Sequence, residues 1–62
     1  MSIYQHVQAA CREKGISVNS LEDKLNFPRG CIYKWDKHRP AVDRIYAVAK
    51  ELKKPIEYFL KE

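Results

Sequence analysis

Glycine, cysteine and tryptophan are scarce in this 62-residue chain, which holds two glycines, two cysteines and one tryptophan. A disulfide between Cys11 and Cys31 is possible on count alone. Small disulfide-stapled domains usually carry four or more cysteines, however, so we expect both thiols to be reduced, with Cys11 in the core. No CxxC pair is present, and His6 and His38 add no zinc-ligand spacing, so we expect no metal ion and no other cofactor.

Long apolar runs are missing as well. No stretch approaches the roughly 18 residues that a membrane span requires, and the N-terminus lacks a signal-peptide pattern, so the sequence predicts a cytoplasmic protein without membrane contact. A chain of this length forms one small domain, residues 1–62, whose core is too small to surround a substrate in a deep cleft. It also lacks an acid–base or nucleophile constellation, so we expect neither an enzyme nor a small-molecule substrate.

Strand patterns are also absent, and apolar residues recur instead at helical spacing. A first helix is expected to end at Gly15, and a second to run from the N-cap Ser17 to about Leu25. Ser20 with Asp23 forms a rival capping box, which would leave this second helix barely a turn and a half.

Each of the three prolines opens a further helix in this interpretation. Asn26 suits a left-handed turn, after which Pro28 begins a third helix over 28–36. Pro40 opens a fourth helix and Pro55 a short fifth. The predicted fold is therefore all-α, a compact domain of five helices with short connections. Its expected core comprises Ile3, Val7, Leu21, Leu25, Phe27, Ile32, Trp35, Ile45, Val48, Ala49, Leu52 and Phe59.

Positive charge is concentrated in one part of the chain. The formal net charge is +4, and the sequence pI is about 9.2. Residues 29–44 hold five cations and two anions, so most of the net charge lies in a quarter of the chain. This concentration indicates a polyanionic partner. A solvated basic face without a partner accounts for the same charges, and the charges alone do not separate the two interpretations.

Residues 17–36 have the spacing of a helix-turn-helix motif. Leu21 and Leu25 on one helix, a turn at Asn26, and Ile32 and Trp35 on the next helix would share one apolar side. The first turn and the outer face of the second helix would then remain free. A protruding helix of this kind fits the major groove of B-DNA.

With these residues the sequence resembles the phage-repressor and Cro type of helix-turn-helix domain, the xenobiotic-response-element class. The resemblance covers nearly the whole chain and rests on KGISVNSLEDKLNFPRGCIYKWD, RPAVDRIYAVAKEL and PIEYFL. It implies a lambda-repressor-like fold in which residues 28–36 form the recognition helix. Several positions depart from the family pattern, including Asn26 in place of the turn glycine and Pro28 in place of the serine that caps the recognition helix. Glu22 stands where a small alanine normally lies between the motif helices, and Cys11 replaces an arginine that often pairs with the acidic residue here at Asp36, which therefore needs another partner.

The family geometry also implies which residues meet DNA. Base contacts are expected from Arg29, Gly30, Tyr33 and Lys34, and Arg29 suits bidentate hydrogen bonds to guanine. Gly30 would let the backbone approach the base pairs; alternatively, it avoids a clash with a neighbouring helix. The start of the first motif helix and the ends of the second provide the expected phosphate contacts, which are Val18, Asn19, Pro28, Lys37, His38 and Arg39.

The sequence thus predicts a sequence-specific regulator that binds double-stranded DNA, most simply a small phage or mobile-element repressor. Such proteins usually act as homodimers on near-palindromic operators, and the segment 55–60 is the expected self-contact. The alternative is a protein-interaction module, an antitoxin or antirepressor, that grips another protein through aromatic residues such as Tyr4, Tyr46 or Tyr58. The cation cluster around the third helix favours DNA.

Overall fold

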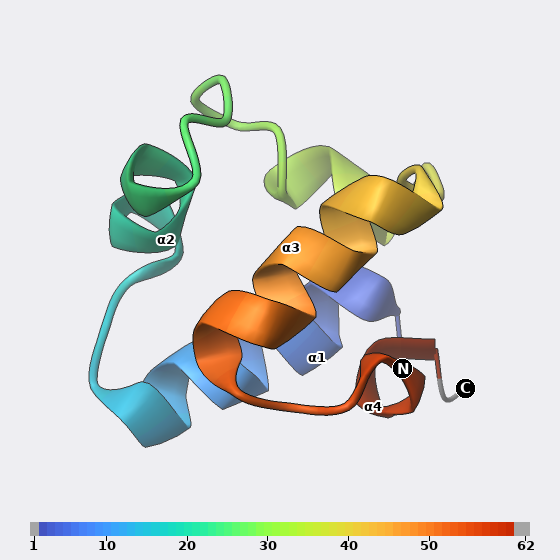
Figure 1. The fold of residues 1–62 in the computed structure, drawn as a ribbon. Coiled ribbons are helices and arrows are strands. Elements are labelled where there is room, and N and C mark those ends of the chain that lie inside the picture. Colours follow the sequence, from blue (N-terminus) through green and yellow to red (C-terminus); the bar gives the residue numbers. More distant parts are fainter. Residues whose placement is uncertain (1, 61–62) are drawn as a thin grey trace.

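The computed structural model describes residues 2–60, and every regular element in that range is helical (Figure 1). Helix α1 spans Ile3–Lys14, α2 spans Val18–Lys24, α3 spans Val42–Leu52 and α4 spans Ile56–Leu60. A single 3₁₀ turn, η1, covers Tyr33–Asp36. The predicted all-α class is therefore confirmed, but the described residues form four α-helices where five were expected.

Helix α1 is the element on which the others assemble. It contacts α2, η1, α3 and α4, and α3 packs in addition against α4. In Figure 1, α3 crosses in front of α1, α2 stands to one side, and the connection from α2 to η1 passes over the top of the view. That connection and η1 contain half of the residues expected to meet DNA, namely Pro28, Arg29, Gly30, Tyr33 and Lys34.

Local signals set three of the helix boundaries as predicted. Gly15 takes φ 74° at the end of α1, a left-handed conformation that glycine adopts without steric cost. Ser17, rather than Ser20, caps α2, because its side chain accepts a hydrogen bond from the Ser20 N–H at 3.0 Å. Asn26 turns the chain with φ 59°. A fourth signal was missed in the sequence: Ser2 caps α1 through a reciprocal capping box with Gln5.

The core is close to the predicted one. Ten of its twelve expected residues are buried, whereas Leu25 and Phe27 are only partly buried and pack against its edge. Leu25 lies just past the end of α2 and Phe27 lies in the turn, so neither sits on the inner face of a helix. Cys11 is buried as expected, with Ala10 beside it in the core, and both cysteines are free thiols.

None of the helices within residues 2–60 combines the length and the apolar character needed to cross a bilayer.

Candidate nucleic-acid interface

The segment 28–36 is not the α-helix that was predicted. Its first residues form a tight turn, in which the Cys31 N–H donates to the Pro28 carbonyl at 3.0 Å. Gly30 has φ 85°, a conformation outside the right-handed helix. Helix-like bonding begins only afterwards and ends within the four residues of η1. The prediction of a recognition helix over 28–36 is therefore wrong, because the backbone reverses its handedness at Gly30.

Glu22 supplies the physical reason for this turn. Its side chain is only 1% exposed, yet it is a carboxylate at the position where the motif helices meet. Oε1 accepts from the Gly30 N–H at 3.2 Å, and Oε2 accepts from the Ile32 N–H at 3.0 Å. A buried carboxylate needs such donors, and the turn brings two backbone N–H groups to it. The sequence marked Glu22 as a departure from the family pattern but gave no sign of what it binds.

The backbone conformation at position 30 explains why this residue is glycine. A Cβ atom at this position would meet nothing within 4 Å, so the alternative that glycine avoids a clash with a neighbouring helix is wrong. The positive φ is the feature that other residues adopt only at a cost. Closer approach to base pairs, the other explanation, remains a prediction.

We expect Gly30→Ala to lower the free energy of unfolding by about 1 kcal/mol, because alanine is strained at positive φ. Urea denaturation measures the change. Gly15→Ala is a matched control, since Gly15 has φ 74° and equally open surroundings. If 28–36 were instead helical in solution, alanine would stabilise Gly30's position by about 1 kcal/mol, so a gain in stability contradicts the turn.

Arg29 is held against α2. Its Nη2 donates to Asp23 Oδ1 at 3.0 Å, and its Nη1 donates to the Asn19 carbonyl at 3.2 Å. Nη1 also lies 3.9 Å from Glu22 Oε1. The side chain is 59% exposed, and exposed ion pairs of this kind contribute little stability. Contact with guanine would require Arg29 to exchange these partners for a base.

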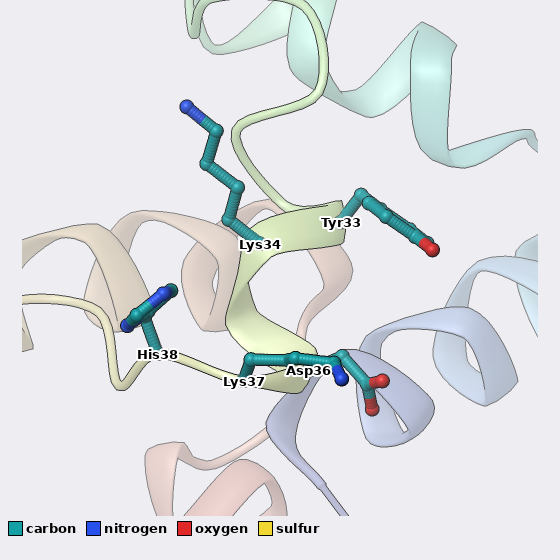
Figure 2. Close-up of a pocket in the computed structure, with 5 residues that line it drawn as sticks. All are labelled: Tyr33, Lys34, Asp36, Lys37 and His38. Atoms are coloured by element: carbon teal, nitrogen blue, oxygen red, sulfur yellow. The ribbon is translucent and has the colours of Figure 1, made fainter.

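The remaining expected base contacts do not share one direction. A pocket of about 230 Å³ lies at η1. Figure 2 shows Lys34 and His38 extending to one side of the ribbon, and Tyr33, Asp36 and Lys37 to the other. Tyr33 is 66% exposed, and its ring meets the edge of Tyr4 with centroids 5.4 Å apart. Lys34 and Tyr33 therefore do not form the single reading face that a recognition helix was expected to present.

The expected phosphate contacts fall into two groups. Val18 and Asn19 begin α2, where the Asn19 carbonyl accepts from Arg29, and Pro28 is exposed in the turn. The second group follows η1 and consists of the exposed residues Lys37, His38 and Arg39. The first group lies in α2 and at the start of segment 28–36, and the second lies after η1; contact of either group with phosphate stays a prediction.

Asp36 has a hydrogen-bond partner that the sequence did not identify. The hydroxyl of Ser2 donates to Asp36 Oδ1 at 2.9 Å, which ties η1 to the start of α1. The carboxylate is thereby directed away from Lys34 and His38 (Figure 2). Lys34, Lys37 and Arg39 form no ion pair with any residue that the structure describes. Their positive charge is therefore available to an external anion.

Arg44 also lies beside these cations, and the sequence analysis did not predict this position. Together with Lys34, His38 and Arg39 it lines a second hollow, between η1 and the start of α3. The sequence counted Arg44 among the basic residues but assigned it no contact. Its spacing from Lys34 gives no signal, because the loop between η1 and α3 brings the two together.

Comparison with known proteins found no family model, no curated protein and no solved structure that matches this chain.

Proposed function

We propose that this protein binds double-stranded DNA in a sequence-dependent manner, as a small transcriptional regulator of the phage or mobile-element repressor kind. The observation that carries the proposal is the row of exposed, unneutralised cations Lys34, Lys37 and Arg39, with Asp36 among them already engaged by Ser2. Cations without acidic partners favour a polyanion. The resemblance to repressor and Cro-type domains selects duplex DNA among polyanions.

The shape of the segment bears on how it would read DNA. With a rise of about 2 Å per residue, a 3₁₀ turn of four residues extends only about 8 Å, much less than the helix over 28–36 would have provided. One such turn meets few base pairs. Two copies on a near-palindromic site, with half-sites about 34 Å apart, would supply the affinity that one copy lacks.

A second candidate function is protein recognition, and the surface of α3 favours it. Val42 and Tyr46 are 71% and 58% exposed and lie one helical turn apart. Tyr4 and Tyr58, the other aromatic residues considered, are half-buried against the core and offer less surface. An antitoxin or antirepressor would use the exposed α3 residues, and a second copy of the chain would also be able to contact them.

Selection of bound sites from random duplex DNA tests the leading proposal. We expect a recurring half-site, present twice with two-fold symmetry, and two protein chains per duplex in sedimentation. The leading proposal would be wrong if no common sequence were recovered at any ionic strength. If the protein also bound another protein tightly, and Tyr46→Ala abolished that binding, protein recognition would be the function.

Substitution of the cations separates reading from positioning. Arg39→Ala and Lys37→Ala should weaken binding to all duplexes alike and reduce the log–log salt slope by about one unit each, because each removes one phosphate contact. Arg29→Ala should cost about 1–3 kcal/mol on the selected site and relax the preference at one base position. Fluorescence anisotropy with selected and random duplexes measures both effects.

Two controls sharpen this comparison. Arg12→Ala removes an exposed cation at the far end of α1 and should leave the salt slope unchanged. Asp23→Asn removes the negative charge beside the Arg29 guanidinium and keeps the arginine, so binding should be unchanged or tighter. Equal losses for Arg29→Ala on selected and random DNA would show that Arg29 reads no base.

A further inference from the structure

We propose that the hollow between η1 and the start of α3 is a phosphate-binding site centred on Arg44. Lys34, His38, Arg39 and Arg44 line it, and its volume is about 290 Å³. The identification of its natural ligand as one phosphate of a DNA backbone rests on the function proposed above. The existence of the site rests only on the residues described below.

Arg44 is held in place without an acidic partner. Its Nη1 donates to Cys31 Sγ at 2.9 Å, and its guanidinium carbon lies 4.9 Å from the centroid of the Phe27 ring. The neighbouring carboxylate, on Asp43, accepts from the Arg44 backbone N–H instead. Sulfur and ring contacts fix the guanidinium but leave its positive charge unbalanced, which is costly for a half-buried group.

Some cations of residues 2–60 have acidic partners, whereas others do not. Arg29, Lys24 and Lys54 each pair with a carboxylate, namely Asp23, Glu51 and Glu13. Arg44 is the only partly buried arginine among residues 2–60, and it forms no such pair. A guanidinium has five N–H donors in a planar fork that matches phosphate oxygens, and the sulfur takes only one of them.

Two further cations, Lys34 and Arg39, and the imidazole of His38 line the same hollow. Lys34 lies in η1 and His38 lies two residues after it, and both side chains extend to one side of the ribbon, opposite to Asp36 (Figure 2). Arg39 follows directly in sequence. No carboxylate lines the hollow, so its field favours an anion throughout. Its volume lies at the small end for ligand sites, which suits a phosphate group better than a large molecule.

A phosphate group reaches this site either from a nucleic-acid backbone or as a free or small-molecule phosphate, and the chemistry of recognition is the same. We assign the backbone, because the exposed cations Lys34 and Arg39 line the hollow, and because its open shape admits a chain that continues past the bound group. Tight binding of a mononucleotide 5′-phosphate, compared with a duplex, would indicate the other source.

The thiol of Cys31 provides a local readout of occupancy. Cys31 lines the hollow and is half-buried, so iodoacetamide reaches it, and a phosphate on Arg44 would cover it. Cys11 is an internal control, because it is buried in the core and burial raises the pKa of its thiol, both of which suppress alkylation. Mass spectrometry distinguishes the two modified peptides.

We expect inorganic phosphate to slow Cys31 alkylation in a saturable manner, whereas sodium chloride of equal ionic strength does not. Arg44→Gln should weaken the apparent phosphate affinity about tenfold or more, as the loss of charge-assisted hydrogen bonds implies. Arg44→Lys keeps the positive charge but loses the planar set of N–H donors, so its apparent phosphate affinity should lie between those of the wild type and Arg44→Gln. Arg12→Gln, the matched control, should behave like the wild type. Each rate is compared with and without phosphate in the same variant, because the substitutions also alter the surroundings of Cys31.

Two results would overturn the site: protection by phosphate that is equal in wild type and Arg44→Gln, or no protection beyond that of sodium chloride in the wild type. Retention of the thermal midpoint by Arg44→Gln excludes unfolding as the cause of its loss, and Arg44→Lys tests the site if Arg44→Gln does not fold. Failure of the DNA proposal is distinguishable, since phosphate would then protect Cys31 while no duplex binds. Conversely, duplex binding that is unchanged by Arg44→Gln would leave the DNA function standing without this site.

Discussion

Trp35→Ala is expected to lower the free energy of unfolding by about 3–5 kcal/mol, the largest effect of any substitution considered for this chain. The indole is 6% exposed, it belongs to the core cluster, and its ring meets the edge of Phe27 with centroids 6.2 Å apart. A domain of this size has roughly 3–9 kcal/mol of stability in total. The loss is therefore enough to unfold much of the protein at physiological temperature.

Chemical denaturation followed by circular dichroism measures this loss. Trp35→Phe serves as the control, because it keeps a ring against Phe27 and should cost clearly less than alanine. A variant with alanine at this position and an unchanged denaturation midpoint would show that Trp35 is not part of the core. Partial unfolding confined to η1 would appear as a fall in the midpoint with a smaller denaturant slope.

Glu22→Ala is expected to cost about 2–4 kcal/mol. The carboxylate is the hydrogen-bond partner of both the Gly30 and Ile32 N–H groups, and its loss leaves two donors in a largely buried place without an acceptor. Each unsatisfied buried donor costs about 1–3 kcal/mol, and release of a buried charge offsets part of the total. Denaturation measures the cost, and amide exchange at Gly30 and Ile32 locates it.

Glu22→Gln separates charge from hydrogen bonding. The amide keeps one oxygen for one N–H but turns an NH₂ group toward the other, so it should lose about half of what alanine loses. If Glu22→Ala were more stable than wild type and gained helical signal in circular dichroism, residues 28–36 would prefer the helix, and the role assigned to the carboxylate would be wrong.

The boundaries that were predictable depend on single residues with strong local preferences. Glycine at φ 74° ends α1, serine caps α2, and asparagine turns the chain after it. Such signals act within three or four residues, so the sequence displays them directly. The apolar stripes of α1 and α3 were predictable for a related reason, since helical spacing alone decides which side chains face inward.

The conformation of residues 28–36 was not predictable in this way, because it depends on a residue outside the segment. Pro28 and the apolar pair Ile32 and Trp35 favour a helix from 28 onward, and Gly30 alone costs a helix only about 1 kcal/mol. The acceptor that draws the Gly30 and Ile32 N–H groups into a turn lies on α2, at Glu22. A tertiary hydrogen bond thus overrode a local pattern.

The candidate interface was predictable in composition and not in arrangement. Charge counting along the sequence identified the basic segment. It did not show that Asp23 engages Arg29, or that Cys31 and Phe27 hold Arg44. Those pairings join residues up to seventeen positions apart through the turn at Gly30, and the sequence predicted a helix in place of that turn.

The three side-chain hydrogen bonds that hold segment 28–36 also imply an order of folding. The carboxylate of Glu22 reaches its two amides across 8 and 10 residues, whereas Ser2 reaches Asp36 across 34. Loop-closure entropy grows with the logarithm of loop length, and the longer closure costs about 1.3 kcal/mol more than the shortest. The turn at Gly30 is therefore expected to order while η1 is still detached from α1, so that the segment docks onto the first helix with its bend already in place.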